Sequence, residues 1–333
     1  MEKKYHICIT IGILLTCLFA LIAISLGQFS ISMIDVWKIL FHQSVEIKNA
    51  ETVIFHVRIP RILLSLIAGS GLAVAGAAFQ SLFSNPLATP DTLGCANGAS
   101  FGATLGILIG LKSIGVQMSA LFMGILAVIL VFVVSKTTQR ESSNMMMVIL
   151  AGMVVSSLFS ALVSFVKYVA DPNDVLPVIT FWLMGSFSSA TLRSLYTGAP
   201  CILIGIVVIY FMRYRLNALT LSEDEAKSFG INLKWNRFIV IAASSMITAS
   251  VVSLCGVIGW VGLLIPHICR MLFGNNQSKV IPGCIVFGAL FMLLVDTLAR
   301  CMCQSEIPVS ILTSVIGAPV FIILLRKTGG IHV

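Results

Sequence analysis

The chain has 333 residues, of which 58% are hydrophobic and 10% are charged, and its formal net charge is +8. Soluble domains carry about a quarter charged residues, so this composition excludes a soluble domain and indicates a polytopic membrane protein. The polar stretches are too short to enclose cores of their own. We therefore expect an all-α fold with a single transmembrane domain over residues 1–333.

Ten apolar stretches approach the length that a helix needs to cross a bilayer, which is about 20 residues. They lie at residues 7–27, 59–82, 93–111, 115–135, 145–168, 194–212, 235–255, 257–273, 280–300 and 307–325. The eighth stretch is short and broken. An even number of spans places both termini on one side of the membrane.

The basic residues set the orientation of these spans. With cytoplasmic termini, most of the 21 Lys and Arg residues lie on the cytoplasmic side, as the positive-inside rule requires. We expect residues 28–58 to form an external loop and residues 213–234 to form a cytoplasmic segment.

The external loop contains a short amphipathic stretch from Ser32 to Phe41. Its apolar residues are Ile34, Trp37, Ile39, Leu40 and Phe41. This composition favours a helix that lies in the membrane interface; a simple loop is the alternative.

Two prolines stiffen the turn between the second and third spans, Asn85-Pro-Leu-Ala-Thr-Pro-Asp-Thr-Leu-Gly. Proline fixes φ and biases the preceding residue toward an extended conformation. The turn suits a structured constriction on the cytoplasmic side, and an ordinary tight turn fits the pattern nearly as well.

The third span carries a glycine at every fourth position, namely Gly94, Gly98, Gly102, Gly106 and Gly110. Residues four apart lie close to one helix face, and small residues there let a neighbouring helix approach closely in lipid. We expect a tight helix contact. The alternative is that this face lines a translocation path.

The cytoplasmic stretch from Arg213 to Lys234 carries the signals of a short capped helix. Ser222 and Glu225 match a capping box, and Gly230 is placed to end the helix. Such a helix either docks a partner or lies free as a solvated loop helix.

Three glycines and a proline interrupt the apolar stretch from Gly256 to Arg270, at Gly256, Gly259, Gly262 and Pro266. Non-helical backbone is tolerated at membrane depth only where protein buries it or where it lines a cavity. The stretch therefore predicts a broken helix beside a pathway.

Charged and metal-binding residues are few inside the spans. Asp296 lies within the ninth span, where charge is costly, and Arg300, one turn later, is its candidate partner. The five histidines lack metal-binding spacing, and Cys301 and Cys303 have no second pair, so we expect no metal site. The sequence also lacks a G-x-x-x-x-G-K-[S/T] loop for nucleotide phosphates.

Many short blocks follow one another in a specific order between residues 52 and 330. They are Arg58-Ile-Pro-Arg61, Gly76 to Gln80, Asn85-Pro-Leu-Ala with Leu93-Gly, Leu150-Ala-Gly152, Trp182 to Ser186, Gly256 to Arg270, Gly288-Ala289, Asp296 with Ala299-Arg300, Glu306-Ile-Pro-Val and Ile316 to Pro319. In this order the chain resembles the permeases of ATP-binding-cassette (ABC) importers for iron siderophores, haem and vitamin B12. The resemblance implies ten helices per subunit and a dimer of permeases.

The resemblance also implies roles for individual residues. Arg58, Arg61 and Arg300 would hold carboxylates of an extracytoplasmic substrate-binding protein. Coupling to the ATPase would involve Ala218, Leu219, Leu221, Ser222, Glu223, Ala226, Phe229 and Gly230. A cytoplasmic gate would include Asn85, Leu87, Asn144 and Met145, and the pathway or broken helix would include Gln80, Gly256, Gly259, Gly262 and Pro266.

The chain departs from the family pattern at several positions. Asn144, Met145 and Met146 stand where small hydroxylated residues are expected, which puts the gate residues of that loop in doubt. Trp260 replaces a usual phenylalanine, and Ser222 and Ser310 replace usual glycines.

The resulting expectation is a permease subunit, not an enzyme, in the bacterial cytoplasmic (inner) membrane. Its partners would be an ABC ATPase dimer that holds ATP and Mg, a substrate-binding protein, a second permease of the same or a sister chain, and membrane lipid. We expect no cofactor in this chain and no nucleic acid partner. A ferric siderophore is the expected cargo, with haem, vitamin B12 or an oxyanion as alternatives. An ion-coupled secondary carrier is a distant alternative. Such carriers usually keep ionisable residues inside the membrane for the coupling ion, whereas here Asp296 is nearly alone within the predicted spans.

Overall fold

The structure is a computed structural model, and it describes residues 2–29, 31–41, 43, 47, 49–135, 145–221, 223–228, 230–303 and 305–327. All regular structure in these residues is helical. The predicted class, an all-α polytopic membrane protein, is confirmed.

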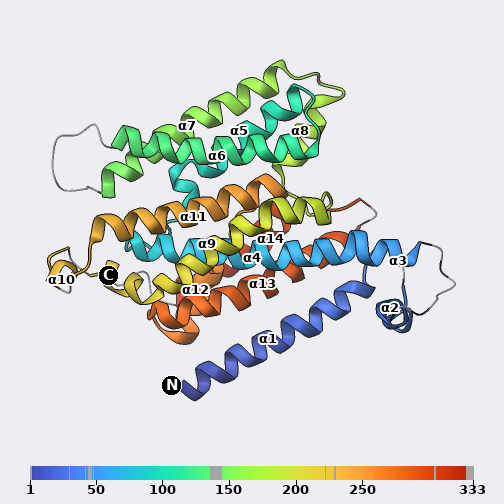
Figure 1. The fold of residues 1–333 in the computed structure, drawn as a ribbon, viewed down its shortest axis with the longest axis horizontal. Helices are drawn as coiled ribbons and strands as arrows, with labels where there is room; N and C mark the ends of the chain where they lie inside the picture. Colours follow the sequence, from blue (N-terminus) through green and yellow to red (C-terminus); the bar gives the residue numbers. More distant parts are fainter. Residues whose placement is uncertain are drawn as a thin grey trace.

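Ten helices of the described chain match the ten predicted spans one to one (Figure 1). They are α1 (Glu2–Ser25), α4 (Ile59–Leu82), α5 (Cys95–Leu108), α6 (Ser113–Ser135), α7 (Met145–Val169), α9 (Leu192–Leu219), α11 (Leu233–Cys255), α12 (Val261–Phe273), α13 (Gln277–Cys301) and α14 (Val309–Lys327). Seven apolar helices in the described residues are long enough to cross a membrane, and α12 and α14 are shorter apolar helices. The predicted short eighth span is α12.

Short elements connect these helices: α2 (Met33–Leu40), α3 (Ala50–Thr52), η1 (Val53–Arg58), η2 (Pro90–Leu93), α8 (Val175–Leu183) and α10 (Glu223–Ser228). α3 and η1 continue directly into α4, which makes one helix of 33 residues. Figure 1 shows α2 and α3 at one end of the bundle and α10 at the other. We refer to these as the α2 end and the α10 end.

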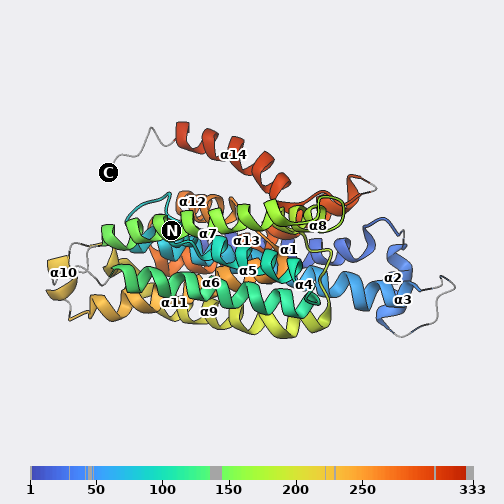
Figure 2. The ribbon, with the colours of Figure 1, turned by 90° about the horizontal axis from the view of Figure 1, so that it is seen from above.

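α4 lies at the centre of the bundle and contacts α9, α11, α12 and α13. In the continuous helix that contains α4, 83% of its 18-residue apolar stretch is buried inside the protein, whereas the corresponding share in α1 is 11%. Figure 2 shows α14 on one side of the bundle, next to α12, with α9 and α11 on the opposite side. α4 is therefore the element around which the other helices pack.

Glycines on α4 allow two neighbours to approach its backbone directly. A Cβ atom added at Gly69 would overlap the carbonyl oxygen of Gly288 in α13, and one added at Gly76 would overlap the carbonyl oxygen of Gly262 in α12. Small residues at helix interfaces are the usual means of close association in lipid, where packing drives helix contact.

The predicted glycine face of the third span forms a second close contact, between α5 and α6. Added Cβ atoms at Gly98 and Gly102 would overlap backbone atoms of α6, and one at Gly106 would lie 3.3 Å from a Cα atom of α6. Gly94 and Gly110 have φ of 73° and 74° and serve as left-handed residues at the helix ends. The tight contact is confirmed for the three central glycines.

The short helix predicted between Ser32 and Phe41 is present as α2, and its place in the membrane interface stays a prediction. Ser32 caps it by accepting a hydrogen bond of 3.1 Å from the amide of Asp35. Val36 and Ile39 are buried, whereas Ile34 and Trp37 on the other face are exposed. The helix therefore packs one face on the protein and presents an apolar face outward, as an interfacial helix does.

We expect Gly69→Ala to lower the free energy of unfolding by about 1–3 kcal/mol, because overpacking at a backbone contact forces helices apart. The measurement is thermal unfolding of the purified protein in detergent. Gly259→Ala is the matched control, since a Cβ at Gly259 meets nothing within 4 Å. Equal melting temperatures for the two variants would contradict the role assigned to Gly69.

Candidate functional site

A buried ion cluster links α4 and α13 near the α2 end. Nε of Arg61 lies 3.0 Å from Oδ1 of Asp296, and Nη2 lies 2.9 Å from the same oxygen. Nη1 of Arg61 donates to Oε1 of Glu306 at 2.6 Å. Asp296 is fully buried, so the planar guanidinium, which holds two carboxylates at once, offsets the cost of burying this charge.

Two further arginines beside this cluster hold the end of α1. Arg58 donates to the carbonyl oxygens of Ile24, at 2.5 Å, and Ser25, at 3.0 Å, and also to Phe29. Arg300 donates to the carbonyl oxygen of Ala23 at 2.6 Å. The last carbonyls of a helix lack intrahelical partners and carry partial negative charge, so cationic donors stabilise the end of α1.

The sequence prediction for this cluster was incomplete. The predicted pair of Asp296 and Arg300 exists at 4.0 Å, but Arg61, 235 residues away in the chain, is the closer partner. Spacing along one helix cannot reveal such a partner. Arg58, Arg61 and Arg300 are each at most 5% exposed and use internal acceptors, and their predicted docking role stays a prediction.

The predicted break between the seventh and eighth spans lies between α11 and α12. α11 ends at Cys255, Gly256 has φ 72°, and α12 begins only at Val261. The amide of Ser186 donates to the carbonyl oxygen of Cys255 at 2.8 Å, and a Cβ at Gly256 would overlap the carbonyl oxygen of Trp182. The irregular backbone is thus buried against the segment that follows α8, as membrane depth requires.

The non-helical segment is shorter than the sequence suggested, because Gly262 and Pro266 lie inside α12. Proline cannot donate a hydrogen bond to the carbonyl four residues earlier, which here belongs to Gly262. Nε2 of Gln80 in α4 donates to that carbonyl oxygen at 3.0 Å. Arg270 in turn donates to Oε1 of Gln80 at 2.5 Å, so Gln80 ties α12 to α4 and compensates for Pro266.

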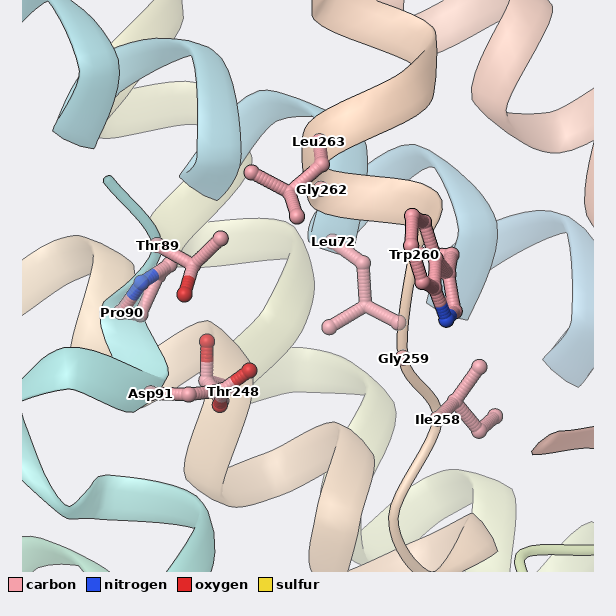
Figure 3. A pocket seen from close by; sticks show the side chains of 10 residues that line it. All are labelled: Leu72, Thr89, Pro90, Asp91, Thr248, Ile258, Gly259, Trp260, Gly262 and Leu263. Carbon is pink, nitrogen blue, oxygen red and sulfur yellow. The ribbon is translucent and has the colours of Figure 1, made fainter. Parts of the chain in front are cut away.

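A cavity of about 90 Å³ lies beside this break (Figure 3). It is lined by Leu72, Thr89, Pro90, Asp91, Thr248, Ile258, Gly259, Trp260, Gly262 and Leu263. These residues come from α4, η2, α11, the break and the start of α12. Gly259 and Gly262, predicted as pathway residues, therefore share a real cavity.

Sequence reasoning missed two of the polar residues that line this cavity, Asp91 and Thr248. Asp91 lines the cavity and is exposed, and no residue in the described chain is found hydrogen-bonded to its carboxylate. Oγ1 of Thr248 is buried without a hydrogen-bond partner. The one signal in the sequence for this site was Asp91, an acidic residue in the proline-containing turn. Asp91 lies beside Thr248 because η2 folds back against α11.

Trp260 borders the cavity in an unusual conformation. Its φ is 71°, a left-handed value that is strained for an aromatic residue. Its ring packs against Phe321 of α14 with centroids 6.3 Å apart, and a Cβ at Gly317 would lie 2.8 Å from Cβ of Trp260. Contact with α14 thus helps to hold the break in its shape.

The predicted gate residues are partly placed. Oδ1 of Asn85 accepts a hydrogen bond of 2.9 Å from the amide of Leu87, which closes a tight turn of the kind that the sequence suggested. Leu87 is 48% exposed, and Met145 begins α7. Asn144 lies outside the described residues.

The predicted coupling helix is α10 at the α10 end of the bundle. Ala226 and Leu219 are buried there and Leu221 is 44% exposed; Ala218 is half-buried. Gly230 follows α10 with φ 70°, the left-handed value expected of a helix-ending glycine. Glu223 begins the helix, whereas the predicted N-cap Ser222 and Phe229 lie outside the described residues.

In the part of the chain that the structure describes, no group of three or more His, Cys, Asp or Glu side chains could hold a metal ion. Cys301 and Cys303 are both exposed free thiols.

Comparisons with known proteins connect this geometry to a transport family. Residues 14–327 match the family model of the FecCD transport family. The chain is 41% identical to the molybdate import system permease protein MolB of Haemophilus influenzae, over 94% of both chains. It is 32% identical to a protein of Helicobacter pylori named as a probable iron chelatin transport system permease protein, over 99% of this chain and 100% of the other. A solved structure described as a metal-chelate type ABC transporter, in an inward-facing conformation, superposes with a TM-score of 0.87 at 39% identity and covers 96% of this chain and 99% of its own.

We expect Asp296→Asn to lower the free energy of unfolding by about 3–5 kcal/mol, because it leaves Arg61 charged in a buried site. Thermal unfolding in detergent measures the loss. The double variant Arg61→Leu with Asp296→Leu should recover part of it, since removing both charges removes the cost of burying them. Glu306→Gln is the control with a smaller expected effect, because the Glu306 side chain is 28% exposed. Wild-type melting of Asp296→Asn would contradict the prediction.

Proposed function

The chain belongs to the FecCD transport family, the permeases of type II ABC importers for metal chelates, haem and vitamin B12, and from that premise we propose that its cargo is a ferric-siderophore-type iron chelate. As a permease subunit it is a multi-pass membrane protein and not an enzyme, and ATP binds to the separate ATPase. An ABC importer permease works with that ATPase and with a substrate-binding protein. Family membership rules out the ion-coupled secondary carrier.

The similarity to a metal-chelate type transporter over nearly the whole chain is the observation that carries the proposed cargo. The Helicobacter pylori relative, named for an iron chelatin, supports the same class. Neither relationship identifies one chelate, because the binding protein makes the first selection. Haem and vitamin B12 are the other cargoes that an uptake assay can distinguish from an iron chelate.

A small oxyanion is the second candidate cargo. It is favoured by the 41% identity to a permease named for molybdate import. Molybdate is a compact anion and a ferric siderophore is a large chelate, so the two candidates make different demands on the charge and width of the pathway.

We place the α10 end in the cytoplasm and the α2 end outside, with cytoplasmic termini. This orientation follows from the excess of Lys and Arg on the α10 side. It puts α10 where a cytoplasmic ATPase could reach it. The exposed Leu221, next to the buried Leu219 and Ala226, would then offer an apolar contact to the ATPase.

For the external side we propose that the binding protein docks over the ion cluster at the α2 end. In the described residues, Arg58, Arg61 and Arg300 lie near two acidic groups, Asp296 and Glu306, and this excess of positive charge would attract carboxylates. Because the three arginines are buried and already bonded, a docking carboxylate would have to compete with Glu306, the more exposed acid of the cluster.

The cytoplasmic gate is proposed to include the turn of Asn85 and Leu87 and the start of α7 at Met145. η2, which follows that turn, contacts α7. A displacement of the turn would therefore be transmitted both to α7 and to the cavity that Thr89 and Asp91 line.

We expect Leu221→Asp to uncouple the transporter, because a charge in an apolar contact must be desolvated without a partner. The assay is retention of the ATPase on the purified permease, together with ATP hydrolysis stimulated by the binding protein. Leu221→Met keeps the apolar surface and should behave as wild type. Full ATPase retention by Leu221→Asp would remove this residue from the proposed contact.

We expect deletion of this permease to abolish cellular uptake of radioactive iron supplied as at least one ferric siderophore. Mutation of the phosphate-loop lysine of the partner ATPase should have the same effect, because the energy comes from ATP. Uptake of labelled molybdate, haem and vitamin B12 in the same strains provides the comparison. Loss of molybdate uptake with unchanged iron uptake would overturn the proposed cargo in favour of the oxyanion.

A further inference from the structure

The cavity beside the helix break contains the carboxylate of Asp91. Asp91 lies on η2, between α4 and α5, and shares the cavity with Leu72, which is midway along α4. η2 contacts α4, α5, α6, α7 and α11, so this segment folds back into the bundle after α4 has ended. An ionisable residue at such a position is expected to have a function or a partner.

In the part of the chain that the structure describes, no protein partner accounts for Asp91. Among the ten lining residues it is the only charged one, and no other described group is found to bond its carboxylate. Figure 3 shows the side chains of Thr89, Asp91 and Thr248 gathered on one side of the cavity, with Ile258 and Trp260 on the other. Within the described residues, the cavity therefore presents a carboxylate with no protein cation among its lining groups.

The hydroxyl of Thr248 provides a second and independent sign of a missing ligand. Thr248 is 2% exposed, and its Oγ1 atom has no hydrogen-bond partner in the described chain, as is also true of three serine hydroxyls on α11, those of Ser244, Ser245 and Ser250. Of these four side chains, that of Thr248 is the one that lines the cavity. Threonines in helices usually satisfy this oxygen on the carbonyl of the preceding turn. A buried polar atom without a partner is costly, and a ligand in this cavity would relieve that cost.

The chemistry of these groups selects the kind of ligand. An ionised carboxylate can only accept hydrogen bonds, and a threonine hydroxyl can accept as well as donate. A protonated amine, with three donor hydrogens, could satisfy Asp91 and Thr248 together. A tetraoxoanion offers only acceptors and negative charge, and the carboxylate would repel it at short range.

The size of the cavity limits how much of the cargo it can hold. Its volume of about 90 Å³ corresponds to roughly three water molecules at about 30 Å³ each. One terminal group of a metal chelate would fit, whereas a whole ferric siderophore would not. A molybdate ion is small enough to fit, so charge and not size would exclude it.

We propose that Asp91 and Thr248 form a subsite in the translocation pathway that binds an ammonium or other hydrogen-bond-donor group of a metal chelate and disfavours free oxyanions. This inference rests on the proposed import of metal chelates and names the chemical group that the pathway recognises. Trp260, across the cavity, supplies an apolar wall and a built-in optical reporter.

The test measures binding through the fluorescence of Trp260. The permease carries Trp37→Phe, Trp182→Phe and Trp235→Phe, so that Trp260 is its single tryptophan. It is assembled with its ATPase in lipid nanodiscs without nucleotide. The tryptophans of the ATPase are replaced by phenylalanine as well. The probes are ferrioxamine B, a ferric trihydroxamate with a free protonated amine, its N-acetylated form, which lacks that charge, and molybdate. Free N-acetyltryptophanamide corrects for light absorbed by the chelates.

Ferrioxamine B should quench Trp260 saturably, and N-acetylation should weaken its binding about tenfold, the effect of losing one charge-assisted hydrogen bond. Asp91→Asn should weaken binding of ferrioxamine B by a similar factor and leave binding of the acetylated form unchanged. Asp91→Glu should retain the preference for the amine, and Thr248→Val should reduce it. Asp174→Asn is the matched control, since Asp174 is exposed and caps no amide with its side chain.

Two results with Asp91 and Thr248 unmutated would overturn the proposed subsite. One is equal binding of ferrioxamine B and its N-acetylated form, and the other is no quenching of Trp260 by either chelate. Displacement of ferrioxamine B by molybdate would also overturn it. Failure of the proposed cargo is a different result, namely unchanged cellular iron uptake in the deletion strain. If the amine preference is present and iron uptake is unchanged, the subsite stands and the cargo is another donor-bearing compound.

Discussion

The close approach of helix backbones to α4 is the constraint on which the rest of this structure depends. In lipid, two apolar helices gain little by leaving the solvent, so packing and polar contacts decide which helices associate. Gly69 and Gly76 remove the side chains where α13 and α12 meet α4. These two contacts fix the neighbours of Arg61 near one end of α4 and of Gln80 near the other.

The polar contacts that hold the bundle together run between helices, whereas buried hydroxyls such as that of Thr297 bond within their own helix. Pro266 frees the carbonyl of Gly262, and Gln80 of α4 supplies the donor that α12 lacks. Asp296 of α13 is held by Arg61 of α4, and the end of α1 is held by Arg58 and Arg300. Each bond joins two elements that are distant in the chain, so the low dielectric of the membrane makes these contacts decisive for the arrangement of the helices.

The cavity differs from these contacts, because neither its carboxylate nor its threonine hydroxyl has a hydrogen-bond partner in the described chain. It lies where the break between α11 and α12, the folded-back η2 and the middle of α4 meet. A transport pathway needs sites that bind a passing ligand only weakly, and unpaired acceptors meet that need. The negative charge is also what separates the two candidate cargoes, since a chelate with a donor group would be attracted and a free oxyanion repelled.

The sequence by itself determined the membrane class, the ten helical segments and the position of the helix break. Apolar length, glycine spacing and proline are local signals, and the bilayer translates them directly into helices and their ends. It also identified Asp296 as a charge in need of a partner and Gly98 to Gly106 as a contact face. Only the tertiary structure showed that Arg61 is that partner, that Gln80 compensates for Pro266, and that Asp91 meets Thr248 in a cavity. These contacts join residues far apart in the chain, and their formation depends on how helices pack and on a segment that folds back, neither of which leaves a periodic trace in the sequence.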